Sequence, residues 1–254
     1  MSPATDMTFA RTLGIYYREA AYESRRMLRT PSFAGPFLAL PVLLYLLFGV
    51  LLFGAATKGD PKAQLYVFMG FVTFGVMGPG IFGFGVAVAS EREHGLLQLK
   101  RAFPVPPFAC LLAKMAMAMV FVAIIMLTMV AAGSFGPLHF TAAQWARMTL
   151  AGVFGAVPFC AMGLFIGTLA TAKSAPAFAN LVYLPMIYLS GFLIPLPASM
   201  TRVAAFSPAY HLHQLTLAAI GAPSEGAVAL HLAVLIGLTV VLTALAVRRL
   251  ARVG

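Results

Sequence analysis

The sequence predicts an all-α integral membrane protein with six transmembrane helices. Of its 254 residues, 61% are hydrophobic and only 9% are charged, whereas soluble domains carry about 25% charged residues. Six apolar runs each approach or exceed the roughly 20 residues that a helix needs to cross a bilayer. Backbone amides in lipid need internal partners, so these runs are expected to be helices rather than the alternating strands of a barrel.

The six runs follow one another through the chain, and we expect residues 1–254 to form a single transmembrane domain. The runs are Phe33–Phe53, Leu65–Ala89, Phe108–Ala132, Met148–Ala170, Ala175–Ile194 and Ala227–Val247. The first run begins behind a charged segment, and no small-residue cleavage site follows it. A cleaved signal peptide is therefore not expected.

The net charge of +10 follows the predicted topology. With the N-terminus in the cytoplasm, 13 of the 17 basic residues lie inside, as the positive-inside rule requires. The inner set is Arg11, Arg18, Arg25, Arg26, Arg29, Arg92, Lys100, Arg101, Lys114, Lys173, Arg248, Arg249 and Arg252. We therefore predict a multi-pass membrane protein with both termini cytoplasmic and no nucleic-acid partner.

Residues 8–30 precede the first span and predict an amphipathic helix. Arg11, Arg18, Arg25 and Arg29 recur at helical spacing, and Tyr22 lies on the same face. A helix with basic and aromatic faces beside a first span is expected to lie in the inner membrane interface. It could serve as an anchor that sets the topology or as a contact for a partner.

Small residues in the second and fourth spans predict close helix contacts. Six residues of the second span, Gly75, Gly78, Pro79, Gly80, Gly83 and Gly85, permit close approach and a kink. The fourth span carries Gly163 and Gly167 at small-xxx-small spacing. Both packing within the chain and a dimer contact are compatible with this spacing.

The outer segment at residues 195–226 is too apolar for a solvated loop, yet four prolines interrupt it. It predicts two short helices, Ala198–Phe206 and Ala209–Ile220. Each is too short to cross a hydrocarbon core of roughly 30 Å. We expect them to be re-entrant, or to lie on the outer surface, before the last span.

The most charged stretch of the chain lies between the second and third runs. Residues 91–103 begin with Glu91 and Glu93, and Lys100 and Arg101 follow, which suits a helix dipole. In a chain with so few charges, this pattern predicts a cytoplasmic helix on which a soluble partner docks. A merely charged inner loop is the alternative.

Several site types are missing from the sequence. By these boundaries no carboxylate lies inside a span, which disfavours a proton-coupled carrier and a magnesium-dependent membrane enzyme. His211 and His213 have no acidic residue nearby in sequence, and Cys110 and Cys160 suggest neither a disulfide framework nor a metal site. We therefore expect no catalytic residue, no metal and no cofactor in this chain. Energy for any uphill movement would enter through a partner.

Three stretches of the sequence form an ordered pattern. They are Glu91-Arg92-Glu93-His94-Gly95-Leu96-Leu97-Gln98 with Pro104-Val105 and Lys114, then Leu189-Ser190-Gly191-Phe192-Leu193-Ile194-Pro195, then Ser207-Pro208-Ala209-Tyr210. The pattern resembles that of the ABC-2 type transporter permeases. It departs from the family at Leu96, Gln98 and Ala113, where threonine, glutamate and glycine are usual.

The resemblance implies a transmembrane permease subunit of an ATP-driven exporter in the bacterial cytoplasmic (inner) membrane. Its partners would be a second permease copy, forming a homodimer, and two copies of a cytoplasmic ABC ATPase subunit that binds ATP and Mg²⁺. This chain would then be no enzyme itself. The residues assigned to ATPase coupling are Glu91, Arg92, Glu93, His94, Gly95, Leu96, Leu97, Gln98 and Pro104.

Polar groups within the apolar spans are the candidates for a substrate path. These are Asn180, Tyr183 and Tyr188 in the fifth run and Thr73 in the second. For Asn180, a hydrogen bond to a neighbouring helix is the favoured role, and a place on the substrate path is the alternative. The low charge of the spans favours an amphipathic cargo, such as a lipid-linked glycan, a membrane lipid or a hydrophobic drug.

A protein of another class stays possible at this point. The same charged segment suits a membrane module that anchors or regulates a cytoplasmic partner without transport. An ion-coupled carrier and a membrane enzyme agree less well with the sequence, for the reasons given above.

Overall fold

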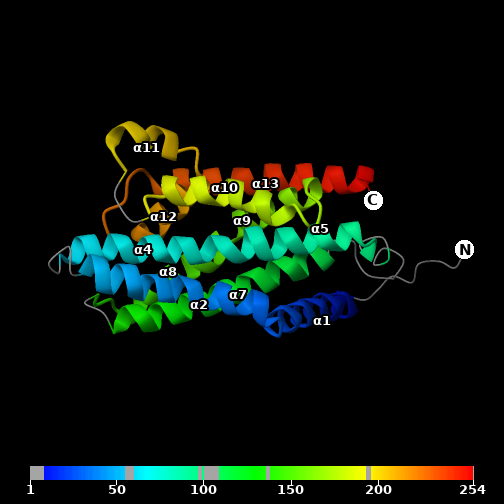
Figure 1. Ribbon diagram of the computed structural model, residues 1–254, viewed down its shortest axis with the longest axis horizontal. Helices are drawn as coiled ribbons and strands as arrows, with labels where there is room; N and C mark the ends of the chain where they lie inside the picture. The colour runs from blue at the N-terminus through cyan, green and yellow to red at the C-terminus, as the bar shows by residue number, and fades with distance from the viewer. Residues whose placement is uncertain are drawn as a thin grey trace, which may run out of the picture.

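The computed structural model describes residues 9–54, 60–96, 99, 109–135, 138–192 and 196–253, and all regular structure within these ranges is helical (Figure 1). The N-terminal half contains α1 (Phe9–Leu28), α2 (Pro31–Leu44), η1 (Tyr45–Phe53), α4 (Pro61–Gly78), η2 (Pro79–Phe84), α5 (Gly85–Glu93) and α7 (Ala109–Ser134). The C-terminal half contains α8 (Ala142–Gly155), α9 (Val157–Leu169), α10 (Ala175–Leu189), α11 (Ala198–Ala204), α12 (Pro208–Ala219) and α13 (Val228–Val253). The all-α prediction is confirmed.

Five continuous helices in the described part of the chain are long and apolar enough to cross a membrane. They are Pro31–Leu52, Pro61–Glu93, Ala109–Ser134, Ala142–Leu169 and Val228–Arg252. The fifth predicted run, Ala175–Ile194, contains the 15-residue α10, and residues 193–195 lie outside the described part. At 1.5 Å per residue α10 is about 23 Å long, less than the roughly 30 Å hydrocarbon core. Five of the six predicted spans therefore have the length that a span needs.

The second span is longer than its hydropathy predicts. It begins at Pro61, changes to a π-helical segment at Pro79, and continues as α5 to Glu93. Proline has no N–H to donate, so the wider helical turn accommodates Pro79 without ending the helix. The predicted charged helix therefore does not begin at Glu91. Glu91 and Glu93 belong to the same helix as the span, which corrects the expectation that no carboxylate lies on one.

The α4–η2 helix lies at the centre of the bundle. Its side chains from Val67 to Met77 are almost all buried, and it packs against α2, α7, α8 and α12. Phe68, Phe71 and Ile81 are among the largest fully buried side chains. The other helices thus surround this one, which places its polar or small residues in the interior.

Glycines allow α9 to contact the second span by its backbone. A Cβ added at Gly163 would lie 2.2 Å from the carbonyl oxygen of Gly80, and one at Gly167 would lie 2.7 Å from that of Gly85. Contacts this short leave no room for a methyl group. The small-xxx-small pattern of Gly163 and Gly167 therefore serves packing within this chain.

The outer segment contains the two predicted short helices, as α11 and α12. Nine of the twelve residues of α12 are buried, and it packs against α4, α8 and α13. In Figure 1, α11 lies at the edge of the bundle and α12 lies among the longer helices near the same end. The high apolar content of the segment is explained by this burial of α12.

The predicted N-terminal helix at 8–30 is present as α1 and packs along α7. Figure 1 shows α1, the end of α5 and the C-terminal end of α13 at the same end of the bundle. Leu13, Tyr17 and Tyr22 on α1 remain exposed. An apolar and basic outer surface of this kind suits a membrane interface.

The glycine contact leads to a stability prediction. Gly163→Ala is expected to destabilise the protein by about 1–3 kcal/mol, since α9 must move away from η2 to admit the methyl group. Thermal unfolding in detergent measures the effect. Gly237→Ala on α13 is the control, because an added Cβ there meets nothing within 4 Å. Equal unfolding temperatures for the two variants would contradict the assignment of backbone contact.

Candidate functional site

A buried ion network joins α1, α5 and α7. The Lys114 side chain on α7 is 0% exposed, and its Nζ donates to Glu91 Oε1 of α5 at 2.7 Å. The same Nζ donates to Glu23 Oε1 of α1. Glu23 and Glu91 are themselves buried. Because charged side chains are almost never fully buried without a partner, each group requires the others to be in place.

Arg26 completes the network from α1. Its Nη2 lies 3.0 Å from Glu23 Oε1 and 3.6 Å from Glu91 Oε1. Two carboxylates then face two cations, so the cluster has no net charge. Arg26 is partly exposed, so the network extends from the buried ammonium to the surface. Residues separated by up to 91 positions in sequence are held together here.

The last turn of α5 also binds the end of α9. Arg92 donates through Nη1 to the carbonyl of Thr168 and through Nη2 to that of Ala170, the latter at 2.7 Å. Carbonyls at a helix C-terminus lack helical partners and carry partial negative charge, so a guanidinium stabilises them. The Glu93 carboxylate accepts from the Ala172 amide at 2.6 Å. The end of α5 is thus fixed to α9 and to the turn after it.

A turn at His94 and Gly95 ends α5, and Leu96 and Leu99 beyond it are again helical. His94 Nδ1 donates to the Ser90 carbonyl at 2.7 Å, and Gly95 has φ +69°, a conformation that favours glycine. Glu93, His94, Leu96 and Leu99 are exposed. Leu97, Gln98 and Pro104 lie outside the described residues. Of the described residues predicted for coupling, Glu91, Arg92 and Glu93 bond to other parts of the chain, and the exposed His94 and Leu96 follow them.

Sequence reasoning missed the part of Glu23 and Arg26 in this network. Lys114 was noticed only as part of a motif. The available signal was rarity, since the chain has just 7 acidic residues and two of them, Glu19 and Glu23, lie in a helix that is rich in arginine. An acidic residue in such a helix indicates a cation partner, although not which one.

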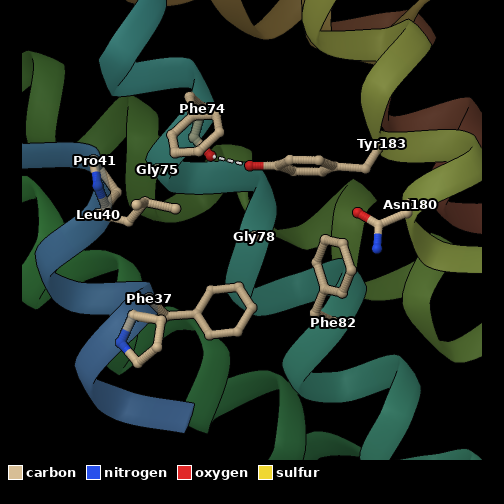
Figure 2. A pocket seen from close by; sticks show the side chains of 10 residues that line it. Phe37, Leu40, Pro41, Phe74, Gly75, Gly78, Phe82, Asn180 and Tyr183 are labelled. Atoms are coloured by element: carbon tan, nitrogen blue, oxygen red, sulfur yellow. Dashed lines mark hydrogen bonds between the residues drawn. The ribbon is translucent and has the colours of Figure 1, made fainter. Parts of the chain in front are cut away.

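A second feature is an aromatic pocket of about 190 Å³ between α2, the second span and α10. Figure 2 shows Phe37, Phe74, Phe82 and Tyr183 around it. The Tyr183 hydroxyl donates to the Phe74 carbonyl at 3.0 Å, and the rings of Phe82 and Tyr183 have centroids 5.2 Å apart. Asn180 also lines the pocket (Figure 2). The wall is mainly apolar with two polar groups, as in sites for amphipathic molecules.

The four residues predicted for a substrate path do not share one site. Asn180 and Tyr183 both line the pocket. Tyr188 is 61% exposed, and its hydroxyl lies 3.7 Å from the Met200 sulfur. Thr73 is buried, donates to the Met69 carbonyl and lies 3.4 Å from His213 Nδ1 of α12. The structure therefore brings together only the first pair.

No group of three or more potential metal ligands occurs among the residues that the structure describes. His211 and His213 are both buried but point to different neighbours, His231 and Thr73 respectively. They do not converge on one site, although they are two positions apart in sequence.

The ion network leads to a second prediction. Lys114→Met removes the shared cation and leaves two buried carboxylates beside each other, so a loss of about 3–5 kcal/mol in unfolding free energy is expected. Chemical denaturation in detergent measures it. Lys173→Met is the control, since Lys173 is exposed on the same end of the bundle.

A triple variant separates charge burial from packing. Lys114→Met with Glu23→Gln and Glu91→Gln removes all three buried charges, and it should recover part of the lost stability. If the single and triple variants are equally unstable, the charges are not the cause. If Lys114→Met is as stable as Lys173→Met, the network does not hold the helices together.

Comparison with known proteins agrees with this architecture. Residues 19–221 match the model of the ABC-2 type transporter family. A protein of Bacillus subtilis (strain 168) described as transport permease YvfS is 24% identical over 204 residues, which cover 78% of this chain and 82% of that protein. The family match includes α5, the ion network and the aromatic pocket. Because the match covers most of its length, this chain belongs to the ABC-2 type transporter family.

Proposed function

We propose that this chain is the transmembrane permease subunit of an ATP-driven ABC-2 type exporter. It would move an amphipathic or lipid-linked substrate outward, powered by a separate ATPase subunit that binds ATP and Mg²⁺. The observation that carries the proposal is the anchoring of the α5 end to α1, α7 and α9 through Glu91, Arg92 and Glu93. The family membership supports it.

The anchored α5 end provides a mechanical route for coupling. The exposed residues His94, Leu96 and Leu99 directly follow the buried contacts of Glu91 and Arg92. A force applied to the segment from Glu93 to Pro104 by a docked ATPase would therefore move α5 together with its partners. ATP would drive this movement because it would bind one of two arrangements of the complex more tightly than the other.

The aromatic pocket provides a site for an apolar or amphipathic substrate part. Its lining comes from α2, the second span and α10, so relative movement of these helices would change its shape. The helices α2 and α10 also carry exposed apolar side chains, such as Leu43 and Leu181. A second copy of the chain packed on these helices would cover the pocket and form the homodimer. Both termini would lie in the cytoplasm of a bacterial cell, on the side of the ATPase.

Gly95→Pro tests the coupling segment. Proline requires φ near −65°, which is incompatible with the observed +69°, so the turn after α5 must change. We expect the purified complex with its ATPase to insert and to unfold at the wild-type temperature, yet to lose at least tenfold in ATP-dependent flipping of a fluorescent phospholipid. Glu93→Ala, which removes the contact to Ala172, should act in the same direction.

Gly35→Ala is the matched control, because an added Cβ there meets nothing within 4 Å. Wild-type flipping by both the Gly95 and Glu93 variants would contradict the coupling assignment. If crosslinking in native membranes captures no ATPase and no ATP-dependent flipping occurs, the chain is better described as an anchoring module.

Asn180→Trp tests the pocket. The larger side chain is expected to fill the space between Phe37 and Phe82, lowering phospholipid flipping at least tenfold while ATP hydrolysis by the partner continues. Leu127→Trp on α7 is the control, since Leu127 is exposed and lies away from the pocket. Equal flipping by the two variants would place the substrate path elsewhere.

A further inference from the structure

A buried pair of histidines joins α12 to α13 and has no part in the proposed transport mechanism. His211 and His231 are each 2% exposed. Their Nδ1 atoms lie 2.7 Å apart, within hydrogen-bond distance. Two bare nitrogen lone pairs at this separation would repel, so a proton must lie between them.

The Nε2 atom of each ring already donates a hydrogen bond to a backbone carbonyl. His211 Nε2 lies 2.8 Å from the Ala205 carbonyl, and His231 Nε2 lies 2.7 Å from the Glu225 carbonyl. A carbonyl oxygen can only accept, so both Nε2 atoms carry protons. The hydrogen-bond network assigns the tautomers in this way without any observed hydrogen.

Counting protons over the pair gives one more than two neutral rings hold. Each neutral imidazole carries one proton, and both of these are used at Nε2. The bond between the Nδ1 atoms needs a third. We propose that His211 and His231 form a proton-binding site, which holds one excess proton between the two rings at the junction of α12 and α13.

The pair is bordered by Tyr210 and by the loop that contains Glu225. Tyr210 lies beside both rings, with centroid distances of 5.6 Å to His211 and 6.2 Å to His231. The Tyr210 hydroxyl donates to the Glu225 carboxylate at 2.8 Å, and the Glu225 amide donates to Gln214 Oε1. These bonds hold in place the loop whose Glu225 carbonyl accepts from His231.

Titratable groups on the neighbouring helices have other contacts or are exposed. On α4, the ring of Tyr66 packs against His213 rather than against the pair. On α11, Arg202 is exposed, and it is the carbonyl of Ala205 that bonds to the pair. Arg147 of α8 is exposed. The groups in contact with the pair are therefore Tyr210 and the Glu225 loop.

Release of the proton has a structural consequence. Burial and the nearby His231 lower the pKa of His211, while its hydrogen bond to Ala205 acts in the opposite direction. A neutral pair holds only two protons and cannot keep all three hydrogen bonds. One of three hydrogen bonds must then break: His211 to the Ala205 carbonyl, His211 to His231 of α13, or His231 to the Glu225 carbonyl.

The experiment is ¹⁵N NMR of the histidine-labelled full-length protein, followed from pH 4.5 to 8.5. For His211 and His231 of the wild type, both Nε2 atoms are expected to have the chemical shifts of protonated nitrogens. Both Nδ1 atoms should have chemical shifts between those of bare and protonated nitrogens. A bare Nδ1 signal should appear as the pH rises. Two neutral rings across the whole range would overturn the proposal.

His231→Gln is the decisive variant. A glutamine amide can donate both to the Glu225 carbonyl and to a bare His211 Nδ1, so every contact is satisfied without an excess proton. The intermediate signals and the titration should vanish while the unfolding temperature stays near that of wild type. His139→Gln, at an exposed position, should leave them unchanged.

A second variant protects the test against misfolding. If His231→Gln does not fold, His211→Gln makes the mirror-image replacement, with its amide donating to the Ala205 carbonyl and to His231 Nδ1. Persistence of the intermediate Nδ1 signals in either folded variant would show that the proton is not shared by these two rings. That outcome would overturn the proposal independently of any result on transport.

Discussion

The arrangement at one end of the bundle depends on neutralising the buried charge of Lys114. An ammonium group with no exposed surface is stable only beside carboxylates, and here Glu91 and Glu23 supply them from two other helices. Because those acids belong to α5 and α1, the requirement of one side chain determines how three helices meet. This contact fixes the end of α5 and therefore the position of the turn that follows. The coupling proposal depends on that fixed position.

The second constraint is the contact between α9 and the central helix. Gly80, Gly85, Gly163 and Gly167 bring the two backbones so close that any side chain would separate them. Arg92 then connects the end of α9 to the end of α5. The ion network, the glycine contact and the aromatic pocket all involve the helix Pro61–Glu93. Movement of this helix would therefore affect the contacts at the end of α5 and the pocket together.

Sequence reasoning misjudged where the helix that carries the first charges of the predicted coupling segment begins. The hydropathy of the sequence falls at Ser90, yet the helix continues to Glu93. It can do so because the side chains of Glu91 and Arg92 bond to groups on other helices. For the substrate path, polarity within a span was a weak guide. Asn180 and Tyr183 line one pocket, whereas Thr73 faces α12 and Tyr188 is exposed. Polarity alone does not say which way a side chain points on a helix.

Composition and the lengths of the apolar runs by themselves determined that the regular structure of the described residues is helical, where its five long helices lie, and that short helices precede the last of them. These properties follow from local chain chemistry and from the absence of water in the bilayer core. Only the tertiary structure decided which residues meet, such as Lys114 with Glu23, or His211 with His231. A hydrogen bond depends on distances of a few ångström between segments far apart in sequence, and hydrophobic periodicity carries no information about those distances.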